Sequence, residues 1–419
     1  MRILLKLPKV NLINIWIYAV IISILFRLSI WVFSIFIPIT NESGIPISPL
    51  NANSGIDLNF YVAESLYYKD YLCSLYNIIV SSDGCITKAI FIADVSQFLR
   101  PFELTNLVGG TPMIDELDIQ FPAGPILPTL IIITNFTNTP WILSFIFFLF
   151  SSYLVYISIK WLNQKNVSWF WLFLYGGLPI PVWFMLNISP DLLFAIVVST
   201  FLFIISSETK NLKNTNTVIY LIALSFISIL LKPNGLSLFI FVFCFLLYED
   251  ILSNKFKILI ILISLILFIL FIYFYGFYLF SFIKSSSLYR QIFGYTQIEY
   301  INGIYNFLPD ALNKVFSWFS LLFAKLLYLS GLRPTFGETN NYLVLIRSSV
   351  GLIIFPGIIW LFFKGSFVEK LFVIIFLAPI LLGLAQERYS IPIYPILFFY
   401  GTLFYTHVFK TIYSTFKTT

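Results

Sequence analysis

Charged residues are scarce in this chain, and their scarcity excludes a soluble globular protein. Only 11% of the 419 residues are charged, whereas 59% are hydrophobic and 20% are aromatic. A soluble domain carries about 25% charged residues. The 25 basic residues give a net charge of +6, but they are scattered at the ends of apolar runs. They therefore indicate orientation in a membrane and not a nucleic-acid-binding face.

Histidine and cysteine are nearly absent. The chain has one histidine, His407, and three cysteines, with none of the Cys and His spacings that hold zinc. The sequence therefore argues against a mechanism that needs a histidine base or a histidine-bound metal. His407 is expected to be structural, and chemistry falls to carboxylates, Lys, Arg or Tyr. Cys73 and Cys85 share one polar segment and are candidates for a disulfide outside the cytoplasm, whereas Cys244 lies in an apolar run.

Long apolar runs dominate what is present. The run 257–280 exceeds the ~20 residues that a helix needs to cross a bilayer. Strand-like alternation is absent, and only helices or closed barrels satisfy their backbone in lipid. We expect an all-α polytopic membrane protein with about 11–12 transmembrane helices. The candidate spans are 12–38, 140–162, 167–186, 190–207, 216–231, 236–249, 256–283, 312–331, 343–363, 367–385 and 391–409.

The basic residues predict which loops face the cytoplasm. The N-terminus lacks a cleavage site for a signal peptide, so 12–38 is read as span one with a cytoplasmic start. The segments 187–191 (NISPD) and 232–235 (KPNG) then face outward. If 386–392 (QERYSIP) also faces outward, an odd number of predicted spans separates it from 232–235, so one span is wrong or 284–311 holds a re-entrant segment. The cytoplasmic basic clusters are Lys160 with Lys165, Lys210 with Lys213, and Lys255 with Lys257.

These features divide the chain into four regions. Residues 1–38 form the cytoplasmic N-terminus and first transmembrane helix, and 39–139 form an extracytoplasmic loop with amphipathic helices along the membrane surface. Residues 140–283 form a transmembrane core module, and 284–419 hold the C-terminal transmembrane helices and loops.

The carboxylates gather in the first loop. Of the 19 acidic residues, ten lie between residues 40 and 120. This segment is either a solvated acidic loop or a structured loop that carries function. The ten are Glu42, Asp57, Glu64, Asp70, Asp83, Asp94, Glu103, Asp115, Glu116 and Asp118.

Polar residues interrupt the apolar chain at four places. A charge at bilayer depth costs roughly 2.5–3.5 kcal/mol, so such residues tend to face an interior cavity. If all four places lie on the outer side, they form one cavity wall, although each alone is also explained by an end charge that reaches the membrane surface. The residues are Asp94; Asp191; Lys232 with Asn234; and Glu387 with Arg388 and Tyr389.

At these places the chain resembles the GT-C superfamily of integral-membrane glycosyltransferases. In its first extracytoplasmic loop the family has an aspartate, then an aromatic residue, and further on a leucine, a glycine, a proline and a tyrosine or methionine. The residues that match this pattern are Asp94, Phe98, Leu107, Gly109, Gly110, Pro112 and Met113. Three later elements are similar to those of the family: SPDLLF (189–194), LKPNGLSL (231–238) and ERYSIPIYPIL (387–397). Two departures matter. FPAGP (121–125) stands where relatives have YPP, and Asp57, with Tyr61 four residues on, competes with Asp94 for the catalytic position.

The resemblance implies inverting transfer of a sugar from a polyprenyl-phosphate donor to an acceptor hydroxyl at the outer or lumenal face. Mannose or another hexose is favoured, and the acceptor is a glycan, a lipid or a protein. The general base would be Asp94 or Asp57. Asp191 would bind sugar or acceptor, or hold a divalent cation (Mg or Mn) with Asp94. The other binding candidates are Lys232, Arg388, Asn234, Glu387, Tyr389 and Arg100, with Arg290 and Arg333 in reserve.

Two alternatives stay open. A transporter or flippase of lipid-linked sugars would have inverted repeats and broken helices; the halves show no repeat in hydropathy, but Lys325 and Arg347 fall inside predicted spans. A non-catalytic assembly or chaperone subunit is the third reading. The expected location is a bacterial or archaeal plasma membrane, or the endoplasmic reticulum membrane, with an extracytoplasmic active site.

Overall fold

The computed structural model describes most of the apolar part of the chain. The acidic segment 51–125 and most of the predicted span 256–283 lie outside the described residues. The described residues are 15–40, 46–50, 126–134, 139–186, 188–207, 215–232, 235–248, 305–332, 341–382 and 387–418, with a few single residues between 259 and 269.

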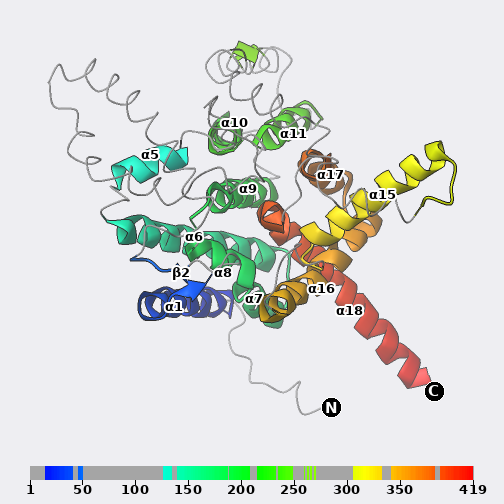
Figure 1. Cartoon of the computed structure of the whole chain (residues 1–419), viewed down its shortest axis with the longest axis horizontal. Coiled ribbons are helices and arrows are strands. Elements are labelled where there is room, and N and C mark those ends of the chain that lie inside the picture. The colour runs from blue at the N-terminus through cyan, green and yellow to red at the C-terminus, as the bar shows by residue number, and fades with distance from the viewer. Residues whose placement is uncertain are drawn as a thin grey trace.

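Nearly all described residues are helical (Figure 1). The exception is one short antiparallel pair, in which β1 (Ile39–Thr40) lies beside β2 (Pro46–Ile47). The helices are α1 (Ile15–Phe36), α5 (Ile126–Ile133), α6 (Pro140–Gln164), α7 (Trp169–Gly176), α8 (Pro179–Leu186), α9 (Pro190–Ser207), α10 (Thr215–Leu231), α11 (Gly235–Tyr248), α15 (Asp310–Leu329), α16 (Asn341–Lys364), α17 (Phe367–Leu382), the 3-10 helix η4 (Glu387–Ile393) and α18 (Tyr394–Thr418).

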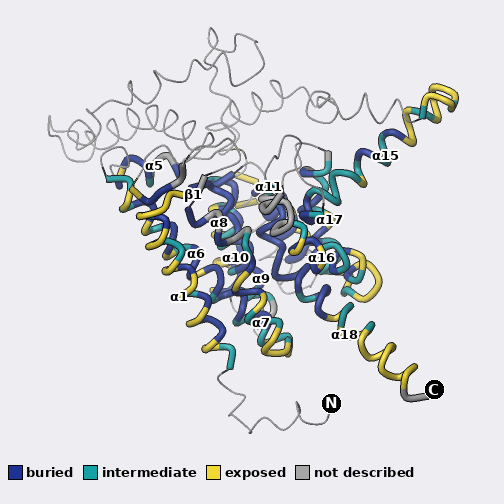
Figure 2. The backbone as a smooth tube through the Cα atoms, turned by 60° about the horizontal axis from the view of Figure 1, so that its bottom comes forward, coloured by how far each residue is buried: buried dark blue, intermediate teal, exposed yellow. Residues whose placement is uncertain are grey.

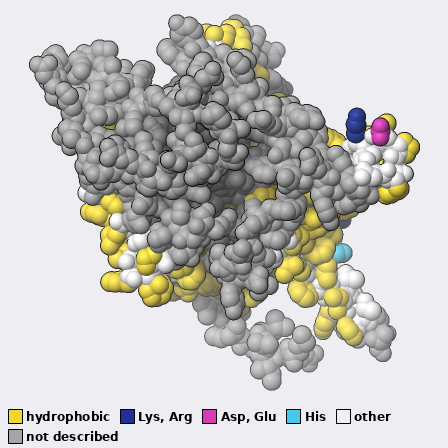
Figure 3. Space-filling view, in the orientation of Figure 1, with side chains coloured by type: hydrophobic (Ala, Val, Ile, Leu, Met, Phe, Trp, Pro, Cys, Tyr) yellow, Lys and Arg dark blue, Asp and Glu magenta, His cyan; other side chains and the backbone are white. Residues whose placement is uncertain are grey.

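Four of the described helices are long and apolar enough to cross a membrane: α1, α6, α15 and the continuous segment 389–416. Side chains that face outward from the bundle are largely apolar, and Figure 3 shows charged side chains only near one end of the described surface on this face. In helix α1 the polar side chains Ser23, Arg27 and Ser34 are buried, whereas the apolar side chains Ile22, Leu25 and Phe33 are exposed. A helix at the surface of a soluble protein has the opposite distribution. The all-α class and helices able to span a membrane are thus confirmed.

The core lies where α6, α9, α11, α17 and the first half of α18 meet (Figure 2). Aromatic rings join three of these helices: Phe372 of α17 lies 4.9 Å from Phe241 of α11 and 6.2 Å from Phe201 of α9, centroid to centroid. Helices α16 and α18 approach each other closely, because a Cβ at Gly357 would overlap the carbonyl oxygen of Leu397. The N-terminal end of α15 and the C-terminal end of α18 project away from this core.

Most predicted spans correspond to single helices, but one does not. The predicted span 167–186 is two short helices, α7 and α8, which meet at Gly177 and Leu178. The helix breaks here because two consecutive glycines favour helix weakly and Pro179 cannot donate the backbone hydrogen bond that continuation requires. Whether 167–186 forms one span stays a prediction. Proline is instead well suited to the first turn of a new helix.

Candidate functional site

The SPD sequence at the start of α9 builds its own helix cap. The Ser189 hydroxyl oxygen accepts a hydrogen bond from the backbone N–H of Asp191 (3.2 Å), and the same hydroxyl donates to Asp191 Oδ2 (2.8 Å). Serine at this position satisfies an N–H group that has no partner inside the helix. Pro190 and Asp191 suit the first turn, where negative charge is stabilised by the helix dipole. Local sequence therefore fixes the Asp191 carboxylate.

Lys232 lies at a helix C-terminus, whereas Asp191 lies at a helix N-terminus. It follows directly after Leu231, the last residue of α10, and its backbone N–H donates to the Ser228 carbonyl (3.1 Å). Positive charge is favoured at a helix C-terminus. Helix α11 begins at Gly235, where a Cβ would overlap the Ser228 carbonyl oxygen, so the turn admits no larger residue without rearrangement. The KPNG sequence thus holds Lys232 at a tight junction between α10 and α11.

The two helix termini meet in a buried ion pair. Lys232 Nζ donates to Asp191 Oδ1 at 2.5 Å, and the side chains are only 7% and 3% exposed, respectively. The same ammonium lies 3.8 Å from the ring centroid of Tyr389, in a cation–π contact. Residues far apart in the chain therefore form one cluster, which we call the Asp191–Lys232–Tyr389 cluster.

The 3-10 helix η4, which carries Tyr389, has a second anchor. The buried Ser390 hydroxyl donates to the carbonyl of Leu329, the last residue of α15, at 2.7 Å. Helix α15 is itself tied to α17, because Lys325 Nζ donates to the Leu381 carbonyl at 3.0 Å. That carbonyl belongs to the last turn of α17, where helix carbonyls lack intrahelical partners. Lys325, which kept the transporter reading open, thus has a bond that serves packing.

The structure brings three of the sequence-predicted site residues together: Asp191, Lys232 and Tyr389. For Glu387 and Arg388 it describes the backbone, within η4, but not the side chains. The functional roles of all these residues stay predictions. The remaining predicted residues lie outside the described part of the chain: Asp57, Asp94, Arg100, Asn234, Cys73, Cys85, Arg290 and Arg333.

The cluster also bears on the predicted topology. Lys232 and Tyr389 contact each other and therefore lie at the same end of the bundle. Two points on one side of a membrane are separated by an even number of crossings. The sequence analysis predicts five spans between these two residues, which is an odd number. Either one predicted span does not cross the membrane, or one additional crossing exists.

The predicted divalent cation stays a prediction, because Asp94 lies outside the described residues and the structure describes only Asp191 of the predicted pair. Its Oδ1 accepts from Lys232 and its Oδ2 accepts from Ser189. The adjacent ammonium would repel a metal ion, and Mg²⁺ prefers a nearly complete set of oxygen ligands. Within the part of the chain that the structure describes, no group of three or more His, Cys, Asp or Glu side chains could hold a metal ion.

Arg27 is a buried charge that the sequence analysis did not select. It is 1% exposed in the middle of α1, and its guanidinium donates to Ser151 Oγ (3.0 Å), the Gly176 carbonyl (2.6 Å) and the Ser23 carbonyl (3.2 Å). Gly176 ends α7, so Arg27 caps the broken helix at its negative end. Its presence inside the apolar run 12–38 was the available signal.

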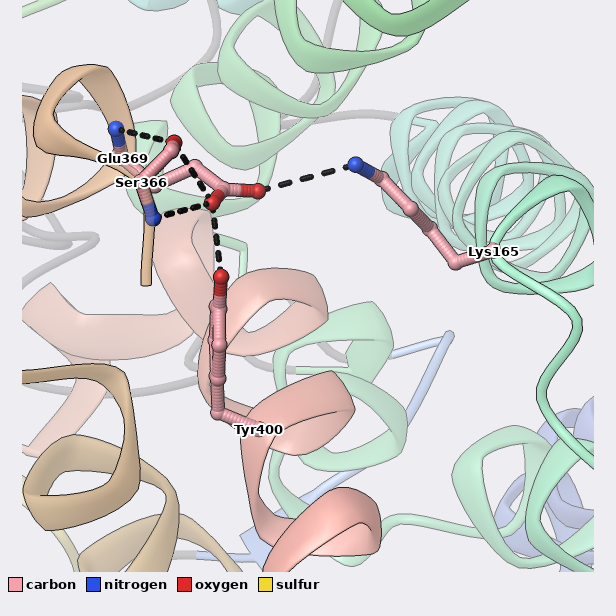
Figure 4. A network of polar contacts seen from close by, with 4 residues as sticks. All are labelled: Lys165, Ser366, Glu369 and Tyr400. Carbon is pink, nitrogen blue, oxygen red and sulfur yellow. Dashed lines mark hydrogen bonds and ion pairs between the residues drawn. The ribbon is translucent and has the colours of Figure 1, made fainter. Parts of the chain in front are cut away.

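A second polar network joins α6 to α17 and α18 (Figure 4). Lys165 Nζ lies 3.6 Å from Glu369 Oε1, and these side chains are 31% and 21% exposed. Glu369 Oε2 accepts from the Tyr400 hydroxyl (2.6 Å) and from the Ser366 hydroxyl (2.7 Å). Lys165 entered the sequence analysis only as an orientation marker, because nothing in the sequence pairs it with residue 369.

Comparisons of the chain with protein-family models, with curated proteins and with solved structures find no match. The function is therefore argued from the residues and their geometry.

Proposed function

We propose that this protein is a multi-pass membrane glycosyltransferase of the GT-C type. It transfers a hexose, with mannose favoured, from a polyprenyl-phosphate donor to an acceptor hydroxyl at the outer or lumenal membrane face. Asp94 or Asp57 takes the acceptor proton as the hydroxyl oxygen attacks C1 of the sugar. The bond between C1 and the phosphate oxygen breaks, the configuration inverts, and polyprenyl phosphate leaves with the electron pair.

The observation that carries this proposal is the Asp191–Lys232–Tyr389 cluster. It joins three of the four sequence elements on which the GT-C resemblance rests, although 41 residues separate Asp191 from Lys232 and many more separate Lys232 from Tyr389. Ionisable residues inside a membrane-embedded bundle are costly and mark functional sites by default. Helix packing alone does not require that these three elements meet.

The chemistry also needs a cation near the departing phosphate, because negative charge develops there in the transition state. Arg388 precedes Tyr389 directly in η4, and a guanidinium binds phosphate oxygens with two parallel hydrogen bonds. A protein whose helices can cross a membrane meets such a lipid-linked donor in the bilayer itself.

The test uses the purified full chain in lipid nanodiscs. The probes are polyprenyl-phosphate mannose with a labelled sugar and octyl mannoside as acceptor. We expect labelled product from the wild type, and a rate lower by roughly 10²–10⁴-fold in either Asp94→Asn or Asp57→Asn, whichever removes the base. The other of these two variants is the matched control.

A parallel measurement in proteoliposomes separates enzyme from flippase. Movement of intact donor across the bilayer by the wild type, without cleavage of the sugar–phosphate bond and unchanged in both aspartate variants, would contradict the proposal.

A further inference from the structure

We infer that Asp191 and Lys232 are positioning residues that fix η4, and that they do not bind the donor phosphate. The inference rests on the proposed function and changes the roles within its site. Arg388, the neighbour of Tyr389 in η4, is then the residue that meets the phosphate, and the buried ion pair holds the helix that carries it.

The burial and charge of the pair argue against direct phosphate binding. Lys232 is 7% exposed and its charge is neutralised by Asp191, so the pair presents no net positive charge to a ligand. One side of the ammonium faces the carboxylate and another faces the Tyr389 ring. A phosphate that took Lys232 away would leave a buried carboxylate without its counter-charge, which is strongly unfavourable.

The contacts of η4 show what the pair supports instead. Tyr389 rests on the Lys232 ammonium, which belongs to the α10–α11 junction, and the next residue, Ser390, is bonded to the end of α15. Two consecutive residues are thus held by two different parts of the bundle. The backbone immediately before them, at residues 387 and 388, therefore has little freedom to move.

Such a restraint matters for transfer chemistry. A cation that stabilises a leaving phosphate acts through its position before the reaction, and a displacement of about 1 Å costs on the order of 10²-fold in rate. Asp191 acts through Lys232, Lys232 acts through the Tyr389 ring, and the ring acts through η4. Substitution at any of these residues should lower kcat more than it raises KM for the donor.

The test is a double-mutant cycle with Lys232→Met, Asp191→Asn and the double variant, measured in nanodiscs. Lys232→Met removes the ammonium that pairs with the buried carboxylate, so we expect a midpoint of thermal unfolding lower by roughly 5–10 °C. Its kcat should fall by about tenfold or more while KM for polyprenyl-phosphate mannose changes by less than about threefold. The double variant, which buries no charge, should regain most of both losses.

Tyr389 gives an independent arm. Tyr389→Phe keeps the ring face that contacts Lys232 and should retain kcat within about threefold, whereas Tyr389→Leu removes the cation–π contact and should lose about tenfold. An equal loss in both variants would show that Tyr389 acts through its hydroxyl and not through the ring face, and that result would overturn the assignment.

The outcomes separate this inference from the proposed function. A double variant that folds but has a KM for donor raised as far as in Lys232→Met, by tenfold or more, would show that Lys232 binds the phosphate and would overturn the inference. A wild type without transfer would contradict the proposed function. The thermal unfolding measurements still test the inference in that case. If the shifts in unfolding midpoint of the two single variants simply add in the double variant, Asp191 and Lys232 are not coupled and cannot act as a pair that holds η4.

Discussion

The two described ion pairs use similar chemical groups in different surroundings. Lys232 and Asp191 are almost completely buried and 2.5 Å apart, whereas Lys165 and Glu369 are 31% and 21% exposed and 3.6 Å apart. Water and salt reach the second pair, and Glu369 keeps the hydroxyls of Tyr400 and Ser366 as partners if the lysine is lost. Asp191 would lose the ammonium that pairs with it and would keep the hydrogen bond from the Ser189 hydroxyl. The comparison suggests that the stability contributed by an ion pair depends on how well the remaining charge is solvated and hydrogen-bonded once its partner is removed.

The largest expected effect is on the buried pair. Lys232→Met leaves the Asp191 carboxylate without its counter-charge, and we expect a loss of about 3–5 kcal/mol in the free energy of unfolding. Denaturant unfolding in detergent micelles measures it. Lys160→Met is the matched control, because Lys160 contacts Tyr156 and Phe203 but is in no described ion pair. A loss in the control as large as in Lys232→Met would remove the distinction.

An intermediate effect is expected at Arg27, a buried charge with no carboxylate partner among the described residues. Arg27→Met removes the charge and three hydrogen bonds, and leaves the Gly176 carbonyl at the end of α7 without this donor. We expect a loss of about 1–3 kcal/mol in the same unfolding experiment. Arg27→Lys should lose less, because an ammonium keeps the charge at the helix terminus. A larger loss than in Lys232→Met would show that the stranded carboxylate is not the decisive factor.

The smallest effect is expected at the partly exposed pair of Lys165 and Glu369. Lys165→Met should lower the free energy of unfolding by about 0.2–1 kcal/mol. The wild-type contribution should shrink as NaCl is raised from 0.01 M to about 1 M, since the screening length falls from roughly 30 Å to 3 Å. Unfolding curves of wild type and variant at both salt concentrations test this. A difference that does not change with salt would mean that this pair behaves as a buried one.

Sequence patterns predicted the helices well where an apolar run coincides with termination signals. The span 190–207 agrees with α9, because SPD at its start carries a cap, a proline and an acid in the favoured order. The break inside 167–186 was not predicted, since hydropathy averages over the GGLP sequence at the end of α7. The sequence analysis places Asp191 and Lys232 on the same predicted side of the membrane, and the structure adds that the two side chains form an ion pair.

Other features could not be predicted because they depend on tertiary packing. The partners of Lys165 and Arg27 come from helices distant in the chain, and periodicity carries no information about such pairs. The contact between Tyr389 and Lys232 likewise depends on how η4 packs against α9 and α15. The sequence predicts only that the two segments face the same side of the membrane. The roles of Asp94 and Asp57 stay predictions, as both lie outside the described residues.

The most direct measurement of the central claim compares sugar transfer by Lys232→Met and Lys165→Met. Both variants remove one lysine from an ion pair, and both are assayed with polyprenyl-phosphate mannose and octyl mannoside at equal amounts of monodisperse protein. The cluster that contains the buried pair is proposed to organise the transfer site. We therefore predict that Lys232→Met loses about tenfold or more of the rate, while Lys165→Met stays within about twofold of wild type. Equal losses in the two variants, or a greater loss in Lys165→Met, would contradict the account.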